Sequence, residues 1–250
     1  MRVDRIRELE TYLQRKESAT LPELCDYFNV SLNTIRRDIK VLQVNGRVTK
    51  VYGGVLYNPD DAVVPVHDRS HKALPEKDHI GSLAASLVED NDTIYLDSGT
   101  TTLHMLPHLK QYKNLTIVSN SFLVYNEMQH HPEISLFSTG GLYNHKTKSF
   151  VSMGAVDNLK DIRISKAFMG ATGVSIEQGA TNNSFHEAQI KKAVVKIAQK
   201  VILMADHSKL DVTAAVCFSS LANLYAYITD TRPPQELVEF FKNNNIKLLY

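Results

Sequence analysis

The sequence predicts an α/β protein made of two parts, a small N-terminal helical unit and a larger unit around a mostly parallel sheet. Three observations lead to this prediction. Two amphipathic segments, 21–28 and 31–42, lie close together near the N-terminus. A stretch with two prolines at 57–68 lacks any helical period, and from residue 69 onward short apolar runs alternate with amphipathic segments. The expected boundaries are a first domain at 1–56, a linker at 57–68 and a second domain at 69–250.

The segment 31–42 predicts a helix with two different faces. Ser31 is a suitable N-cap residue, because its hydroxyl can accept a hydrogen bond from a backbone N–H of the first turn. Apolar residues at helical spacing form one stripe, which consists of Leu32, Ile35, Ile39 and Leu42. The opposite face carries amide, hydroxyl and cationic groups, namely Asn33, Thr34, Arg36, Arg37 and Lys40. Such groups suit base edges and phosphates, although a merely solvated surface helix would carry similar charges.

The neighbouring segments decide between these interpretations. Residues 21–28 predict a short helix with Thr20 as its cap and Pro22 in its first turn. Its apolar residues, Leu21, Leu24, Cys25 and Phe28, should face inward. Residues 29–31 then form a tight connection, so the two helices make a helix-turn-helix with 31–42 in the recognition position.

A wing is expected after this pair of helices. Asn45-Gly46 should end the recognition helix, and residues 47–55 alternate in the manner of a short hairpin. Arg47 and Lys50 would then point toward the DNA backbone. The expected DNA-binding residues are Ser31, Asn33, Thr34, Arg36, Arg37, Lys40, Arg47 and Lys50.

Composition limits the function classes. The formal net charge of +1 conceals an asymmetry, since residues 1–55 hold 10 Lys and Arg against 7 Asp and Glu. This modest excess favours a local DNA contact, with two copies of the reading head on one operator. The sequence shows neither a long apolar run nor a signal peptide, which predicts a cytoplasmic protein without a membrane partner. Cys25 and Cys217 are expected to be small buried residues rather than a disulfide or metal ligands.

The second domain is expected to alternate helices and strands over a sheet that helices cover on both faces. Helices are predicted at 76–87, 102–106, 122–129 and 185–199. Strands are predicted at 93–97, 115–118, 134–137, 166–169, 201–205 and 225–228. In sheets of this kind, ligands bind outside the carboxyl ends of the strands.

Small polar residues gather at those predicted strand ends. Residues 97–102 follow a strand and open a helix, where free N–H groups and the helix dipole favour an anion such as phosphate. Lys209 is the expected cation. Each turn taken alone is equally typical of a helix cap. The expected ligand-binding residues are Asp97, Ser98, Gly99, Thr100, Thr101, Thr102, Asn120, Ser121, Gly140, Gly141, Gly170 and Lys209.

Several motifs in this order resemble the DeoR family of bacterial sugar-metabolism repressors. They are Ser31 to Asp38, Lys50-Val51-Tyr52-Gly53-Gly54, Leu96 to Thr102, Ser119-Asn120-Ser121, Thr139-Gly140-Gly141 and Asp206-His207-Ser208-Lys209. The resemblance covers nearly the whole chain, and residues 51–55, 146–151 and 166–169 are similar to members that control myo-inositol catabolism. It implies a winged helix-turn-helix joined to a ribose-5-phosphate-isomerase-like α/β domain, which senses a phosphorylated sugar and needs no cofactor.

The resemblance further implies a homodimeric or homotetrameric repressor that binds double-stranded operator DNA and that the sugar phosphate releases from its operator. For the inositol-related members the implied effector is a phosphorylated deoxy-keto-gluconate. An effector that is required for DNA binding remains an alternative.

An isomerase with an appended DNA-binding domain is a second alternative. It would need a carboxylate as general base, and Asp97, Asp206 and Glu187 are candidates by position. His186-Glu187 and His130-His131 lack the further ligands of a metal site and are expected to be surface residues. The sequence therefore predicts neither a catalytic residue nor a metal ligand.

Overall fold

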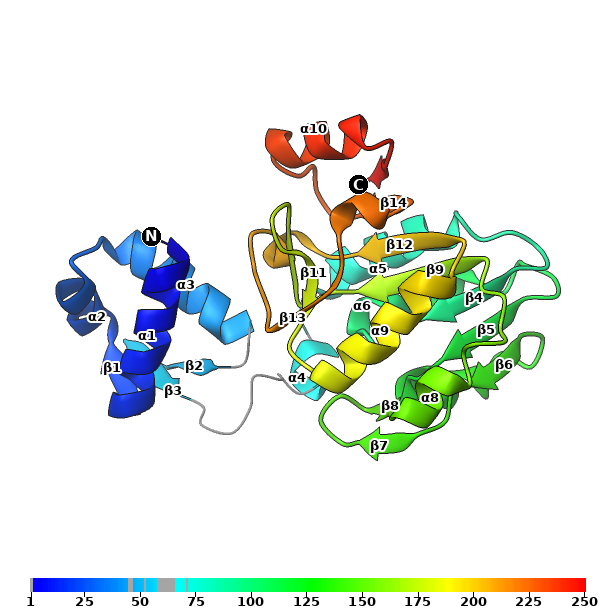
Figure 1. The fold of residues 1–250 in the computed structure, drawn as a ribbon, viewed down its shortest axis with the longest axis horizontal. Coiled ribbons are helices and arrows are strands. Elements are labelled where there is room, and N and C mark those ends of the chain that lie inside the picture. The colour runs from blue at the N-terminus through cyan, green and yellow to red at the C-terminus, as the bar shows by residue number, and fades with distance from the viewer. Residues whose placement is uncertain (1, 45–46, 52, 58–65, 71) are drawn as a thin grey trace. The chain divides into compact units, whose positions relative to one another are not determined.

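The computed structural model describes residues 2–44, 47–51, 53–57, 66–70 and 72–250 (Figure 1). The chain divides into two compact units, Met1–Val64 and Pro65–Tyr250. The expected helix stop at Asn45-Gly46 and most of the expected linker lie outside the described residues. The last part of that linker, residues 66–68, belongs to a short helix, α4 (Val66–Ser70).

The N-terminal unit is a helix-turn-helix with a small antiparallel sheet. Its elements are α1 (Arg2–Lys16), β1 (Ser18–Thr20), α2 (Leu21–Phe28), α3 (Leu32–Val44), β2 (Val48–Val51) and β3 (Gly54–Tyr57). The strand order is β1-β3-β2, and β2 and β3 form the expected hairpin. Thr20 caps α2, and Glu23 returns the hydrogen bond in a capping box. Asn29 then adopts a left-handed conformation, with φ of 49°, in the tight turn between α2 and α3.

The inner face of α3 packs as the stripe predicts, with one exception. Ile35, Ile39 and Leu42 are buried against the core of α1 and α2. Leu32 is 40% exposed, so its expected place in the core is wrong. It is the first residue of α3, and the core begins one turn later at Ile35.

An ion pair also joins α3 to α1. The Nε of Arg5 donates to the carboxylate of Asp38 at 2.7 Å, and Asp38 is almost fully buried.

The larger unit is built on a parallel sheet. Within the described residues this sheet has seven strands in the order β15-β14-β12-β9-β4-β5-β6, and each neighbouring pair is parallel. The strands are β4 (Thr93–Leu96), β5 (Thr116–Ser119), β6 (Ser135–Ser138), β9 (Lys166–Gly170), β12 (Lys200–Met204), β14 (Ala226–Ile228) and β15 (Lys247–Leu249). The prediction of an α/β unit with a mostly parallel sheet is therefore confirmed.

Helices cover both faces of this sheet, as Figure 1 shows for α9 in front of it and α5 behind it. They are α5 (Leu74–Ala85), α6 (Thr100–Leu103), α7 (Phe122–Met128), α8 (Met153–Asp157), α9 (Phe185–Ile197) and α10 (Gln235–Asn243). Alternate residues of each strand reach opposite cores. Tyr95 of β4 packs in the core with α9, whereas Ile94 and Leu96 pack in the core with α5.

The sequence pattern did not predict several short elements. Strands β7 (Leu142–Asn144) and β8 (Ser149–Val151) form a hairpin. Strands β10 (Gly173–Ser175), β11 (Gly179–Asn182) and β13 (Val216–Ser219) form a small antiparallel sheet. The short 3-10 helices are η1 (Leu106–His108), η2 (His207–Lys209) and η3 (Leu221–Asn223). The expected burial of Cys217 is wrong, because this residue of β13 is exposed.

None of the helices in the described ranges is both long and apolar enough to cross a membrane.

Candidate DNA-binding face and sensor site

The outward face of α3 carries the side chains that the sequence assigns to DNA binding. Asn33, Arg36, Arg37 and Lys40 are exposed, as are Ser31 before the helix and Lys50 on β2. The hydroxyl of Ser31 accepts the backbone N–H of Thr34 at 3.3 Å, so Ser31 caps the helix. Thr34 is half-buried, and its hydroxyl lies 3.0 Å from that of Ser31. The exposed cations and amide therefore share one face of a helix whose other face is packed.

Arg47 differs from the other expected DNA contacts. Its Nε donates to the carboxylate of Glu10, and its guanidinium lies over the ring of Tyr57, 5.8 Å from the ring centroid. Arg47 thus holds α1 to the base of the wing in this structure. A phosphate contact would have to compete with the Glu10 ion pair, whereas Lys50 is exposed.

The expected ligand residues lie along one edge of the large sheet, because parallel strands end on the same side. Neighbouring strands are about 4.8 Å apart, so the ends of β12 and β6 are separated by roughly 19 Å. One small sugar phosphate cannot touch all five turns. The strand order brings the ends of β9, β4 and β5 together and leaves Lys209 after β12 and Gly140-Gly141 after β6 on opposite sides.

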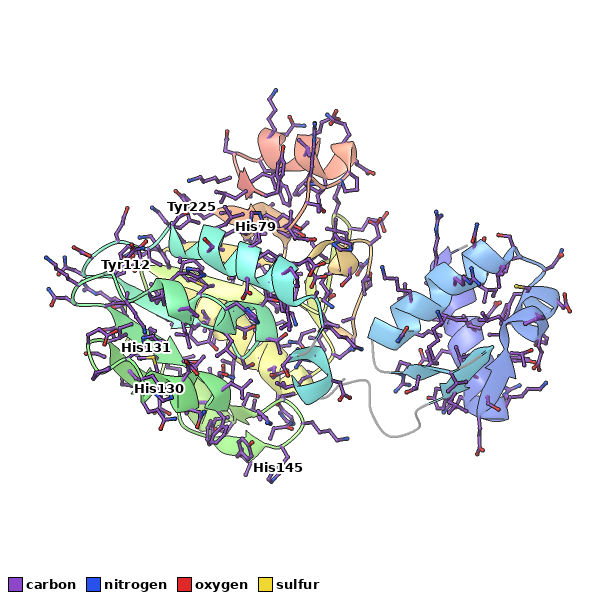
Figure 2. All side chains as sticks on the ribbon, turned by 180° about the vertical axis from the view of Figure 1, so that it is seen from behind. His79, Tyr112, His130, His131, His145 and Tyr225 are labelled. Atoms are coloured by element: carbon purple, nitrogen blue, oxygen red, sulfur yellow. The ribbon has the colours of Figure 1, made fainter. Side chains whose placement is uncertain are left out.

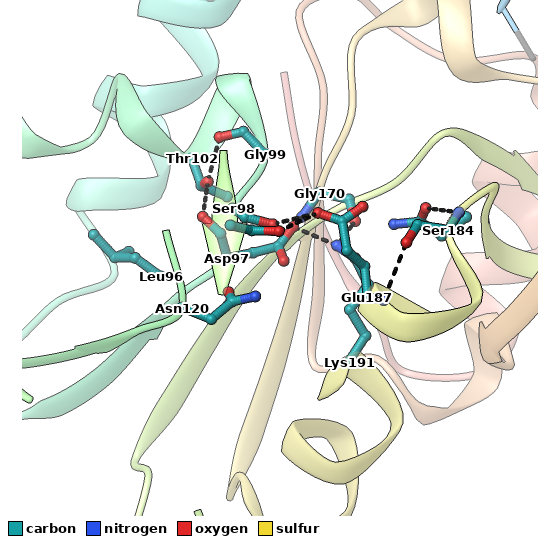
Figure 3. A network of polar contacts seen from close by, with 12 residues as sticks. Leu96, Asp97, Ser98, Gly99, Thr102, Asn120, Gly170, Ser184, Glu187 and Lys191 are labelled. Atoms are coloured by element: carbon teal, nitrogen blue, oxygen red, sulfur yellow. Dashed lines mark hydrogen bonds and ion pairs between the residues drawn. The ribbon is translucent and has the colours of Figure 1, made fainter. Parts of the chain in front are cut away.

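At the centre of this edge, a buried ion pair joins β4, β9 and α9 (Figure 3). The carboxylate of Asp97 accepts hydrogen bonds from the ammonium of Lys191 and from the N–H of Gly170, the latter at 3.0 Å. Lys191 also donates to the carbonyl of Gly170 at 2.8 Å. Asp97 and Lys191 are each 2% exposed. The backbones meet closely here, since a Cβ at Gly99 would lie 3.6 Å from the Cα of Gly170.

Glu187 of α9 lies beside this ion pair (Figure 3). It is buried, so its expected place on the surface is wrong. Ser184 caps α9 and places Glu187 in the first turn, where the helix dipole stabilises a carboxylate. The hydroxyl of Ser98 donates to Glu187 at 2.9 Å, and that of Ser149 does so at 3.1 Å.

These contacts reduce the number of side-chain hydrogen-bond donors that the turn after β4 has for an anion. The Ser98 hydroxyl is directed to Glu187, and the Thr102 hydroxyl donates to the carbonyls of Asp97 and Gly99 at 2.7 and 2.8 Å. Thr100, Thr101 and Thr102 are all buried. On the neighbouring strand end, Asn120 accepts the hydroxyl of Tyr95 at 2.8 Å, and Ser121 caps α7. The hydroxyls of Ser98 and Thr102 are therefore engaged within the protein.

The structure places two further cations near Lys209 that sequence reasoning missed. Lys77 of α5 is 4% exposed and donates its ammonium to the carbonyl of Arg69 on α4. Burial lowers the pKa of Lys77 to about 8; the nearby Asp206 opposes this shift, while Lys209 and Arg69 reinforce it. The charges of Arg69 and Lys209 therefore act on Lys77.

The helical spacing in the sequence did contain a signal for the burial of Lys77 and Lys191. Lys77 lies on the same helical face as Ile80 and Ala84, and Lys191 lies on the same face as Ala188 and Val194. A charged residue inside an apolar stripe is buried with its neighbours and needs a partner.

The histidines that the structure describes do not gather into a metal site. Figure 2 shows His79 on α5, His130 and His131 after α7, and His145 between β7 and β8. His131 is 3% exposed, so its expected place on the surface is wrong, whereas His130 is exposed. In the part of the chain that the structure describes, no group of three or more His, Cys, Asp or Glu could hold a metal ion.

A helix-turn-helix unit with a basic outer face, joined to an α/β unit with polar strand ends, defines a two-domain transcriptional regulator. Residues 5–60 match the model of the DeoR-like helix-turn-helix domain, and residues 72–231 match that of the DeoR C-terminal sensor domain. The chain belongs to the DeoR family. The resemblance in the motifs is thereby confirmed.

Relatives with established names match almost the whole chain. The HTH-type transcriptional regulator IolR of Bacillus subtilis is 37% identical over 98% of both chains. The HTH-type transcriptional regulator GolR of Listeria innocua is 29% identical over 92% of this chain and 91% of its own. The glycerol-3-phosphate regulon repressor of Escherichia coli is 26% identical over 90% of both. The family and these relatives are regulators and not enzymes.

Solved structures match only part of the chain. Ribose 5-phosphate isomerase A from Methanocaldococcus jannaschii has a TM-score of 0.40 at 20% identity, over 54% of this chain and 53% of its own. The eIF2B delta subunit from Chaetomium thermophilum has a TM-score of 0.44 at 15% identity, over 65% and 58%. The chain spans little more than half the length of these structures.

The Asp97–Lys191 pair should be essential for the stability of the sensor unit. Asp97→Asn leaves the Lys191 ammonium buried without a counter-charge, which should lower the free energy of unfolding by about 3–5 kcal/mol. Adding Lys191→Met should recover part of this loss. Urea unfolding followed by circular dichroism measures both, with Asp161→Asn on an exposed residue as the control. An Asp97→Asn variant as stable as this control would contradict the assignment.

Proposed function

We propose that the protein is a DNA-binding repressor of a sugar or polyol catabolic operon and that a phosphorylated sugar releases it from its operator. The observation that carries the proposal is the exposed basic and amide face of α3, in a unit whose opposite helical face is buried. Family membership and the regulators among the relatives support it. The motifs shared with inositol-related members favour an intermediate of inositol catabolism as the effector.

Roles on DNA follow from chemistry and exposure. Arg36 and Arg37 supply most of the contact energy, since arginine binds guanine edges and phosphates with two parallel hydrogen bonds. Asn33 and Thr34 contact base edges, and Lys40 and Lys50 hold phosphates. Ser31 caps the helix and can donate to a phosphate. Arg47 contributes only when it leaves Glu10.

Replacing Arg36 and Arg37 by Ala should abolish sequence-specific binding, because loss of a base-contacting arginine costs about 1–3 kcal/mol. The probe is operator DNA that the wild-type protein selects from a random pool, and gel shift measures the affinity. Arg7→Ala with Arg15→Ala removes the same charge from exposed positions on α1 and serves as the control. Operator binding that is the same for both double variants would refute the assignment.

The repressor acts as a homodimer or homotetramer. One wing and one recognition helix make few phosphate contacts, so tight specific binding requires two reading heads on paired half-sites. The sensor units are proposed to bring these heads together.

Light scattering on the intact protein should therefore give about two or four times the chain mass of 28.1 kDa. The same multiple should persist in the complex with selected operator DNA. A species of single-chain mass in both samples would contradict the proposed assembly.

The effector is proposed to bind at the carboxyl edge of the large sheet. Lys209 of η2 holds its phosphate, together with backbone N–H groups of Ser98 to Thr102. Asp97, Asn120 and Gly170 are the proposed contacts of the sugar hydroxyls, which would have to compete with the bonds that these buried residues make within the protein. Gly140 and Gly141 have positive φ values of 63° and 121°, so their conformation alone accounts for glycine there. Ser121 caps α7 and acts through the position of that helix.

Lys209→Ala should bind a sugar phosphate roughly 10- to 150-fold more weakly, since it loses a charged hydrogen bond of about 1.5–3 kcal/mol. Calorimetry against sugar phosphates and their unphosphorylated parents, with phosphorylated deoxy-keto-gluconate among them, measures this. Lys242→Ala, at an exposed position on α10, is the control. Equal binding of phosphorylated and unphosphorylated sugars, or undiminished binding by Lys209→Ala, would show that the phosphate site is misplaced.

A further inference from the structure

The strand β6 is an unprotected edge of the large sheet (Figure 1). It pairs with β5 on one side, and within the described residues no strand pairs with its other side. An edge strand presents a row of backbone N–H and C=O groups, which proteins usually shield with charged side chains, proline or a covering segment. All four residues of β6 are exposed, and none of them is charged or proline. The strand therefore lacks the side chains that normally prevent pairing with another strand.

The hydrogen bonds to β5 show which backbone groups of β6 point outward. The N–H groups of Ser135 and Thr139 both donate toward the β5 side at 3.0 Å. Alternate residues of a strand bond to the same neighbour, so Leu136 and Ser138 direct their backbone groups away from β5. Two N–H donors and two C=O acceptors thus point outward from the sheet.

Both faces of β6 are apolar at this edge. In the register with β5, Leu136 lies beside Ile117 and Phe137 lies beside Val118. Ile117 belongs to the core with α5, whereas Val118 belongs to the core with α9. Leu136 and Phe137 therefore extend the two cores on opposite faces, yet they are 37% and 43% exposed because the sheet ends there. One further strand would cover both side chains.

The apolar surface continues past the end of the strand. The hydroxyl of Ser138 donates to that of Tyr125 at 2.9 Å, and the Tyr125 ring stacks on Phe150. Phe150 contacts Tyr143 at 5.4 Å between ring centroids, and the adjacent Leu142 is 75% exposed. A stable interface buries about 800 Å² on each partner, which is more than four strand residues supply. This aromatic cluster and Leu142 provide neighbouring apolar area.

Charge and symmetry indicate which strand fits this edge. The other outermost strand, β15, carries the exposed Lys247, a residue type that protects edges. Pairing of β6 with β15 of another copy would also continue into an open filament, whereas two β6 strands close by two-fold symmetry. Glu133 is exposed just before β6. An antiparallel pair separates the two Glu133 carboxylates, because each lies near the far end of the partner strand.

We propose that β6 pairs with β6 of a second copy of this chain, antiparallel across a two-fold axis, and joins two sensor units. The inference rests on the proposed homo-oligomeric repressor and names the surface that assembles it. In this register the backbone of Leu136 exchanges two hydrogen bonds with that of Ser138 in the other copy. Phe137 then lies opposite its own counterpart, at about 4.5 Å between Cα atoms, so the two rings meet on one face.

The first test replaces Leu136 by proline in the full chain. Leu136→Pro removes an outward N–H and keeps the bonds to β5, because this residue faces away from β5. The dissociation constant between subunits should rise at least about tenfold, since each copy loses a hydrogen bond. Sedimentation velocity over a dilution series measures it, and circular dichroism checks the fold. Leu248→Pro, at an outward-facing position of β15, is the matched control and should associate as the wild type does.

The second test uses charge at Phe137 and does not depend on how Leu136→Pro folds. Phe137→Glu and Phe137→Lys each place like charges opposite one another across the two-fold axis, so each variant alone should associate more weakly than the wild type. An equimolar mixture should associate more tightly than either variant alone, because opposite charges then meet. A merely structural role of Phe137 would leave the mixture no tighter than its components.

The outcomes separate this inference from the proposed function. An oligomeric wild type whose association Leu136→Pro leaves unchanged, or a mixture of the Phe137 variants no tighter than its components, overturns the β6 pairing and leaves the proposed assembly in place. Equal weakening by Leu136→Pro and Leu248→Pro also overturns it, because the effect would then not be specific to β6. A wild type of single-chain mass at every concentration overturns both the pairing and the assembly.

Discussion

Parallel pairing of the strands in the large sheet is the constraint on which the rest of the sensor unit depends. It directs the carboxyl ends of β12, β9, β4 and β5 to one edge, where polar turns must lie beside two apolar cores. Charged groups at that edge are partly or fully buried and therefore need partners. The Asp97–Lys191 ion pair satisfies two of them and ties α9 to β4 and β9. Lys77, which is also buried, donates its ammonium to the carbonyl of Arg69.

The DNA-binding unit is held together mainly by apolar packing around α3. Its core is one cluster of apolar side chains, and α3 contributes Ile35, Ile39 and Leu42 to it. The Arg5–Asp38 ion pair fixes α1 to α3, and the Thr20–Glu23 capping box fixes the start of α2. Because these contacts leave the outer face of α3 exposed, Arg36 and Arg37 are available to a partner with the charge and groove of DNA.

The sequence was informative wherever a pattern extends over several residues. Helix α2 has the expected bounds, and the strands that line the candidate site lie within one or two residues of their predicted positions. Three-residue strands such as β7 and β10 are too short to show alternation. Lys77, Lys191 and Glu187 were missed or misplaced because a charged helix residue is usually solvated, and only tertiary packing shows that it is buried. The Arg47–Glu10 pair likewise depends on a contact between distant segments.

Sugar phosphate and operator DNA are proposed to compete through two arrangements of one protein. Linkage requires reciprocity, so each ligand must weaken the other by the same factor. The direct measurement is the affinity for the tightest-binding sugar phosphate, determined by calorimetry with and without saturating operator, beside the operator affinity with and without that sugar phosphate. We expect each ligand to weaken the binding of the other by the same factor, of at least about five. Factors of one, or tighter operator binding in the presence of the sugar phosphate, would contradict it.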